Sequence, residues 1–67
     1  MSLLTIERRV RIIAIRNIAS KLVGPCTDLQ ITTVAVHARI IGSSVKDLEL
    51  LSDLDVDNLW WWLREHP

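Results

Sequence analysis

The sequence lacks most of the covalent and metal links that hold very small proteins together. Its single cysteine, Cys26, cannot form a disulfide within the chain. Cys26, His37 and His66 do not follow the spacing of a zinc site, so we expect no bound metal. A chain of 67 residues buries only about 60% of the surface that its unfolded form exposes, which makes a monomer marginally stable. Because 49% of the residues are nevertheless hydrophobic, we expect another chain to cover part of this apolar surface.

Glycine and proline are also scarce, with two of each, and the chain contains no repeat, linker or low-complexity tract. Gly24 and Pro25 form a helix stop signal between two long segments of helical periodicity. The pattern predicts helices over about 5–23, 28–41, 45–51 and 55–65. We therefore predict a single all-α domain over 1–67, a compact bundle of three to four short helices. The first two helices are expected to form an antiparallel hairpin through Gly24 and Pro25.

Capping residues predict where these helices begin and end. Thr27 and Gln30 match a T-x-x-Q capping box at the start of the second helix, and Gly42 is expected to end that helix. Ser44 and Asp55 are the expected N-caps of the third and fourth helices.

The first predicted helix is apolar on two sides when its residues are placed about 100° apart. One side carries Leu4, Ile15, Ile18 and Leu22, and the other carries Ile6, Val10, Ile13 and Ala14, with Asn17 at its edge. The second predicted helix is apolar on two sides as well. Two such helices provide more apolar surface than one small core needs, so we predict a homodimer. Its interface is expected to contain Ile6, Val10, Ile13 and Asn17, and the single polar residue would set the register of the two chains.

The net charge is zero, but the two halves of the chain carry opposite charge. The first 24 residues are basic, with one acidic residue against Arg8, Arg9, Arg11, Arg16 and Lys21. Residues 47–67 are acidic, with Arg64 against Asp47, Glu49, Asp53, Asp55, Asp57 and Glu65. We favour the interpretation that the two ends pack together and neutralise each other. The alternative is a charged surface that attracts a partner of opposite sign.

Three consecutive tryptophans, Trp60, Trp61 and Trp62, are the most unusual feature of the sequence. Successive helical positions lie about 100° apart, so these side chains cannot all face one core. Trp60 falls on the apolar stripe of the last helix and is expected in the core, Trp62 lies at its flank, and Trp61 lies on the opposite, polar face. Because tryptophan is enriched at binding hot spots, we predict that Trp61 and Trp62 bind a partner protein; the alternative for Trp61 is packing on a neighbouring helix. The acidic residues expected to orient this partner are Asp53, Asp55 and Asp57.

The sequence contains no group of residues typical of an enzyme. It has no glycine-rich phosphate loop, its two histidines are far apart, and the chain is short for an enclosed ligand pocket. His37 is expected at the edge of a helix, and Cys26, just before a helix N-terminus, is expected to have a structural or incidental role. We therefore predict no enzymatic activity and no cofactor.

The apolar runs are short, and none predicts a membrane protein. Ile12–Ile15 and Leu59–Leu63 are far too short to span a bilayer. The first residues reach charged side chains before a secretory signal could form, and a lone thiol is typical of a reducing compartment. Arginines alternate with isoleucines in the first segment and do not gather on one polar face, which disfavours a membrane-surface helix. A cytoplasmic protein is the expectation.

The stretch VHARIIGSSVKDLELL partly matches a helix-turn-helix, with Ala38 and Gly42 at the small-residue and turn positions. The expected recognition helix carries Lys46 against Asp47 and Glu49, and such an acidic surface repels phosphates. A small DNA-binding regulator with a degenerate helix-turn-helix is therefore the alternative function. Its nucleic-acid-binding residues are expected on the first helix, namely Arg8, Arg9, Arg11 and Arg16.

The ends MSLLTIERRV and DNLWWWLREHP enclose one small helical domain without catalytic residues. In this general character the chain resembles the small accessory proteins of temperate bacteriophages. The resemblance implies a protein that binds and redirects a factor of the host, and it assigns no role to any residue. The predicted function is accordingly a non-catalytic adaptor or inhibitor that binds a larger protein. A purely structural dimer within a larger assembly is a third possibility.

Overall fold

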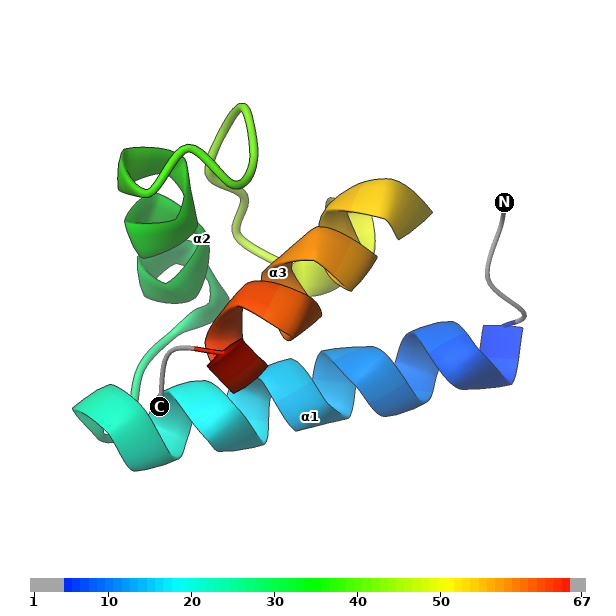
Figure 1. The fold of residues 1–67 in the computed structure, drawn as a ribbon, viewed down its shortest axis with the longest axis horizontal. Helices are drawn as coiled ribbons and strands as arrows, with labels where there is room; N and C mark the ends of the chain where they lie inside the picture. The colour runs from blue at the N-terminus through cyan, green and yellow to red at the C-terminus, as the bar shows by residue number, and fades with distance from the viewer. Residues whose placement is uncertain (1–4, 66–67) are drawn as a thin grey trace.

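Three α-helices form most of residues 5–65, the part of the chain that the computed structural model describes: α1 (Thr5–Val23), α2 (Asp28–His37) and α3 (Asp53–Glu65) (Figure 1). A 3₁₀ turn, η1 (Leu48–Leu50), lies in the connection between α2 and α3. No strand occurs among these residues, so the predicted all-α class is confirmed, with three helices. Leu4 and His66 lie outside the described residues.

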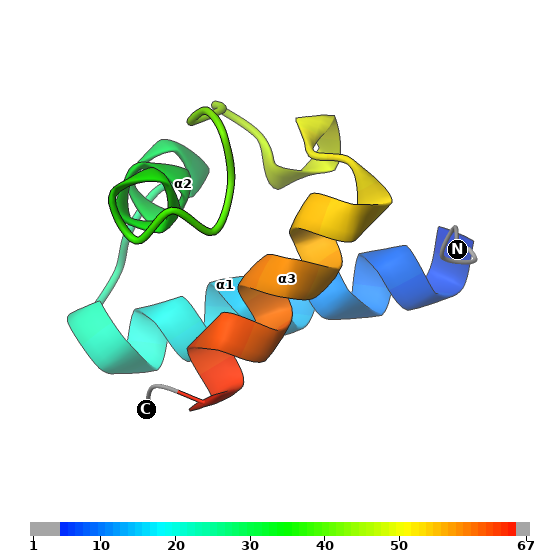
Figure 2. The same cartoon turned by 45° about the horizontal axis from the view of Figure 1, so that its top comes forward.

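The closest packing in the molecule is between α1 and α3, which cross obliquely near the middle of α1 (Figure 2). On α1, the buried residues Ile12, Ile15 and Ala19 recur at intervals of three and four, which places them on one face of the helix. This buried face differs from the predicted one, because Ile18 is only partly buried and Leu22 is exposed. Residues of every element complete the core: Ile31, Ala35, Ile41, Leu48, Leu51, Val56, Leu59 and Leu63.

The predicted antiparallel hairpin of α1 and α2 is wrong. Gly24, with φ +86°, turns the chain out of α1, and α2 then leads away from α1 (Figure 1). The polar ties of α2 go to the following loop: the Thr32 hydroxyl accepts the Val45 N–H at 3.0 Å, and an Asp28 carboxylate oxygen accepts the Leu48 N–H at 3.0 Å. These long-range hydrogen bonds hold α2 against residues 45–48, whereas α1 packs mainly on α3.

α2 begins where the sequence predicts and ends four residues earlier. The capping box is present, because the Thr27 hydroxyl accepts the Gln30 N–H and the Gln30 amide oxygen accepts the Thr27 N–H. At the other end, the Ile40 N–H bonds to the Ala35 carbonyl and the Arg39 N–H bonds to the Val36 carbonyl. This is the Schellman pattern, with Arg39 in the left-handed conformation at φ +62°. The helix therefore ends on an arginine, and Gly42 is not its cap.

The boundaries predicted for the last two helices are also wrong. Residues 45–51 form no α-helix, because the Val45 and Leu48 N–H groups are held by side chains of α2, and only η1 remains, with Asp47 as its N-cap. α3 begins at Asp53, where the Ser52 hydroxyl accepts the Asp55 N–H at 3.2 Å. In residues 45–51, hydrogen bonds to α2 therefore outweigh the local preference for a helix.

Candidate binding groove

The basic start and the acidic end of the chain lie against each other, as the favoured interpretation of the charge pattern predicts. One guanidinium nitrogen of Arg8 donates to the Asp53 carboxylate at 2.6 Å, and the other donates to the Leu51 carbonyl at 2.5 Å. Arg11 donates to the Asp57 carboxylate. These contacts join one end of α1 to the beginning of α3, so their charges are largely neutralised within the chain.

A second charged cluster joins α1 to α2. Arg16 donates to both carboxylate oxygens of Asp28, at 3.1 and 2.7 Å, and lies 3.5 Å from the Asp47 carboxylate. The hydrogen bond from Arg16, together with the one from the Leu48 N–H, holds the pKa of Asp28 below its usual value. The hydrogen bond to Asp28 in turn raises the pKa of Arg16.

The four arginines proposed for nucleic-acid binding are therefore mostly engaged within the chain. Arg8, Arg11 and Arg16 each pair with a carboxylate, and only Arg9 has no such partner within residues 5–65. The second helix of the expected helix-turn-helix is the three-residue turn η1. Neither a recognition helix nor a row of free guanidinium groups is present in the described part of the chain.

The residues predicted to bind a partner protein are spread along α3. Trp61 and Trp62 are eight or nine residues beyond Asp53, which corresponds to about 12 Å along a helix axis. Asp53 and Asp57 face α1, where they pair with arginines, and Asp55 is partly buried. Asp57 lies one helical turn before Trp61, but its carboxylate pairs with Arg11, so the three aspartates do not form an acidic rim around the two tryptophans.

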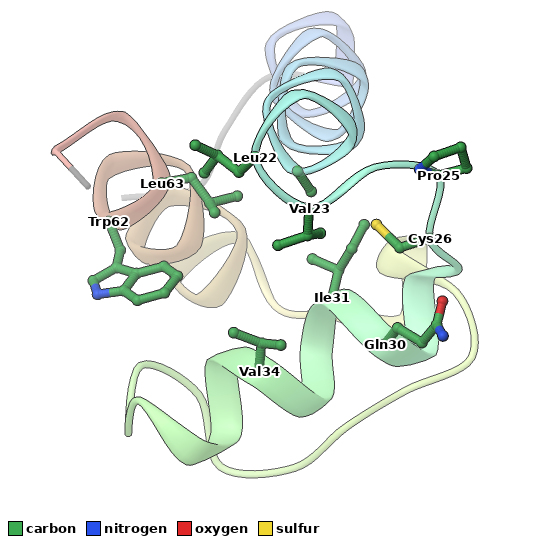
Figure 3. A pocket seen from close by; sticks show the side chains of 10 residues that line it. Leu22, Val23, Pro25, Cys26, Gln30, Ile31, Val34, Trp62 and Leu63 are labelled. Atoms are coloured by element: carbon green, nitrogen blue, oxygen red, sulfur yellow. The ribbon is translucent and has the colours of Figure 1, made fainter. Parts of the chain in front are cut away.

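The three tryptophans occupy three different environments. Trp60 is half-buried at the edge of the core, with the guanidinium groups of Arg11 and Arg64 4.9 and 4.6 Å from its ring centroid. Trp61 is 48% exposed and meets Trp60 edge to face, with ring centroids 5.0 Å apart. Trp62 is partly buried and points toward α2 (Figure 3). The predicted order of burial is confirmed in part, since Trp60 borders the core without lying inside it.

An apolar groove, here called the three-helix groove, opens where α2 leads away from α1 (Figure 3). Its volume is about 310 Å³, and its walls are apolar except for one glutamine. The lining residues are Ala19, Leu22, Val23, Pro25, Cys26, Gln30, Ile31, Val34, Trp62 and Leu63. Sequence reasoning found only Trp62 among them as a site residue.

The floor and the rim of the three-helix groove differ in exposure. Ala19, Ile31 and Leu63 are buried and form the floor, whereas Val34 and Val23 are exposed at its rim. The one polar wall residue, Gln30, already uses its amide oxygen to accept the Thr27 N–H at 2.8 Å. The groove therefore presents an apolar surface with few hydrogen-bonding groups. The groove exists because α2 leads away from α1, whereas the sequence pattern predicted an antiparallel hairpin of these two helices.

A second apolar surface, here called the α1 stripe, runs along α1 on the side away from its buried face. Ile6, Val10 and Ile13 are 70%, 59% and 56% exposed, and Asn17 follows in the same row and is also exposed. The spacing of four, three and four residues is that of a coiled-coil seam. These are the residues predicted to form a dimer interface, and the structure places all four on one exposed row.

The described residues contain no group of three or more His, Cys, Asp or Glu side chains arranged to hold a metal ion. Of the helices within residues 5–65, none has the length and hydrophobicity needed to cross a bilayer. Comparison with protein-family models, with curated proteins and with solved structures finds no match.

Proposed function

We propose that this chain is a non-catalytic protein-binding module, a small adaptor or inhibitor that acts on a larger protein as a homodimer. The observation that carries this proposal is the three-helix groove, an apolar hollow of about 310 Å³ between all three helices. Exposed apolar patches bounded by polar residues are typical of interaction surfaces.

The groove has the composition of a binding hot spot. Trp62 forms one wall, and the exposed side chains of Val23 and Val34 stand at the rim (Figure 3). A partner that covers this wall removes apolar surface from water at about 25 cal/mol per Å². Trp61 lies next to Trp62 in the adjoining hollow and extends the aromatic surface. The two tryptophans are the proposed anchors.

The α1 stripe supports the proposed homodimer. Three β-branched side chains in one exposed row leave apolar surface that a second copy can cover through a two-fold interface. Asn17 continues the row at an equivalent coiled-coil position, where a polar residue favours one register over the others. The dimer interface and the groove are then separate surfaces of the same small domain.

A pull-down with matched variants tests the partner. The tagged protein, Val34→Glu and Leu29→Glu are used as baits with lysate of the organism that carries the gene, with and without nuclease. Val34 and Leu29 are both exposed aliphatic residues of α2, but only Val34 lines the groove. A stoichiometric protein that survives nuclease, is retained by Leu29→Glu and is lost with Val34→Glu supports the proposal. Retention of nucleic acid, with all proteins lost after nuclease, would favour the DNA-binding alternative and Arg9.

Sedimentation velocity tests the homodimer. The wild type is expected to sediment as a dimer, and Val10→Glu as a monomer, because a carboxylate in the seam has no partner. Leu50→Glu is the control, since Leu50 is as exposed as Ile6 but lies in η1, away from the α1 stripe. A wild type that stays monomeric at high concentration would refute the dimer and leave the groove proposal standing.

A further inference from the structure

We propose that the occupant of the three-helix groove is an amphipathic α-helix of the partner protein, with an apolar face inserted in the groove and an acidic polar face. This inference rests on the proposed protein-binding function and names the chemistry of the partner segment.

The lack of hydrogen-bonding groups in the groove argues for a helix. An extended peptide exposes unpaired N–H and C=O groups, and it binds well where a strand edge or polar side chains satisfy them. Residues 5–65 contain no strand, and Gln30, the polar wall residue, already uses its amide oxygen to accept the Thr27 N–H and offers only its NH2 group. A helix satisfies its backbone groups internally and offers the groove only side chains.

The size of the groove limits how much of that helix enters it. A volume of about 310 Å³ corresponds to roughly ten water molecules of liquid, which is far too little for a whole helix. It suffices for a few apolar side chains in the i, i+3, i+4, i+7 pattern by which helices bind grooves. The domain itself measures 28 × 22 × 22 Å, so about four to five turns of partner helix cross it. The rest of the partner helix stays in contact with the rim and solvent.

The charge around the groove selects the polar face of that helix. A hollow that shares Leu22 and Leu63 with the groove contains Lys21 and Arg64. Another hollow, which shares Trp62, contains Arg39 together with the single carboxylate of Glu65. None of the three cations forms an ion pair within residues 5–65, although Arg64 covers the rings of Trp60 and Trp61.

Most of the other acidic residues lie beside arginines of α1 and do not offset these cations. Asp28, Asp53 and Asp57 are held by arginines on α1, and η1 and its N-cap carry Glu49 and Asp47 beside Arg8 and Arg16. Among residues 5–65, the hollows beside the groove thus contain three cations and one carboxylate, in a chain with no net charge. Charge complementarity across an interface then favours an acidic partner face and speeds the encounter.

Two peptide libraries test the inference. Both display helical peptides of about 14 residues, roughly four turns, with the same randomised apolar face. One library has Glu on the polar face and the other has Lys. Both are selected on the immobilised full-length protein, and each binder is then measured against Val34→Glu, Leu29→Glu and the double variant Lys21→Glu/Arg39→Glu.

The expected result is that binders come from the Glu library, lose binding with Val34→Glu but not with Leu29→Glu, and weaken about tenfold with the double variant. Their affinity is also expected to fall as salt rises from about 0.05 M to about 0.5 M. Groove-dependent binders from the Lys library, in equal or greater number, would overturn the acidic partner and leave the protein-binding function intact. Absence of any binder sensitive to Val34→Glu would overturn both. Loss of self-association in Val34→Glu would assign the groove to a second copy and also overturn the inference.

Discussion

α1 has two neighbours, and the two contacts differ in kind. Toward α3 it presents Ile12 and Ile15, which are fully buried, so the contact is closed at its centre. Toward α2, its last residues, Leu22 and Val23, line an open groove. Both contacts include an arginine–aspartate pair, so ion pairs alone do not decide whether two helices close on each other.

The two contacts differ because the polar side chains of α3 bind α1, whereas several of those of α2 bind the following loop. Asp53 and Asp57 of α3 pair with arginines of α1, and Arg8 also donates to the Leu51 carbonyl just before α3. In α2, by contrast, Asp28 and Thr32 are hydrogen-bonded to the loop at Leu48 and Val45. α2 is therefore positioned by the loop, and the apolar surface between α1 and α2 remains open. In this fold the groove stays open because α2 is tied to the loop as well as to α1.

The largest expected effect comes from removing a side chain in the closed contact. Leu59 is fully buried, and Leu59→Ala should lower the free energy of unfolding by about 2–5 kcal/mol, because it leaves a cavity. A domain of this length has only about 3–10 kcal/mol in total, so the variant should be largely unfolded at moderate urea concentration. Urea unfolding followed by circular dichroism, at one fixed protein concentration, measures the change.

The matched change in the open groove is Val34→Ala. It should lower the free energy of unfolding by at most about 0.5 kcal/mol, because the Val34 side chain is already half exposed to solvent. Comparable losses for the two variants would show that the two contacts of α1 do not differ energetically.

An effect smaller than that of Leu59→Ala is expected where α2 is tied to the loop. Thr32→Val keeps the shape of the side chain but leaves the Val45 N–H without its acceptor, which should cost about 1–3 kcal/mol. Amide exchange at Val45 should accelerate in the same variant. Thr33→Val is the control, because the Thr33 hydroxyl bonds only to the Leu29 carbonyl of its own helix. Slow exchange at Val45 in Thr32→Val would mean that the loop is held in place by other contacts.

The pairing of Asp28 with Arg16 should make the contact between α1 and α2 dependent on pH. The pKa of Asp28 is lower in the folded state than in the unfolded state, because Arg16 and the Leu48 N–H favour the carboxylate. Its contribution is therefore complete above the unfolded pKa of about 3.9 and is lost as the pH falls through the folded pKa.

Asp28→Asn should accordingly cost about 1 kcal/mol at neutral pH, a modest value because Arg16 is partly solvated. The difference between wild type and variant in urea unfolding should shrink toward zero in acid, below the folded pKa of Asp28. A difference that stays constant with pH would mean that Asp28 acts through its hydrogen bond to the Leu48 N–H and not through its charge.

The sequence predicted those features that depend on local pattern. The extent of α1, the capping box of Thr27 and Gln30, and the pairing of the basic and acidic ends all follow from spacing and charge. The course of residues 38–52 does not, because Thr32 and Asp28 bind backbone groups 13 and 20 residues away. The groove depends on the path of residues 38–52, so the sequence predicted only Trp62 among the residues that line it.

The smallest expected effect is a gain in stability at the end of α2. Arg39 adopts a left-handed conformation that costs a non-glycine residue about 1–2 kcal/mol, and glycine adopts it freely. Glycine also makes the unfolded chain more flexible, at a cost of about 0.4–1 kcal/mol, so the net gain for Arg39→Gly should be about 0.5 kcal/mol. The same change removes a cation beside the groove and should weaken binding of an acidic helix.

Stability and binding are thus expected to move in opposite directions in Arg39→Gly, with urea unfolding and peptide titration as the two measurements. Arg39→Lys keeps both the charge and the backbone strain, and it should change neither quantity by much. If both expectations hold, binding accounts for an arginine in this strained position at the end of α2, because stability alone favours glycine there. If Arg39→Gly were more stable and bound the acidic peptides as well as the wild type, the attraction at the rim would have to come from Lys21 and Arg64 alone.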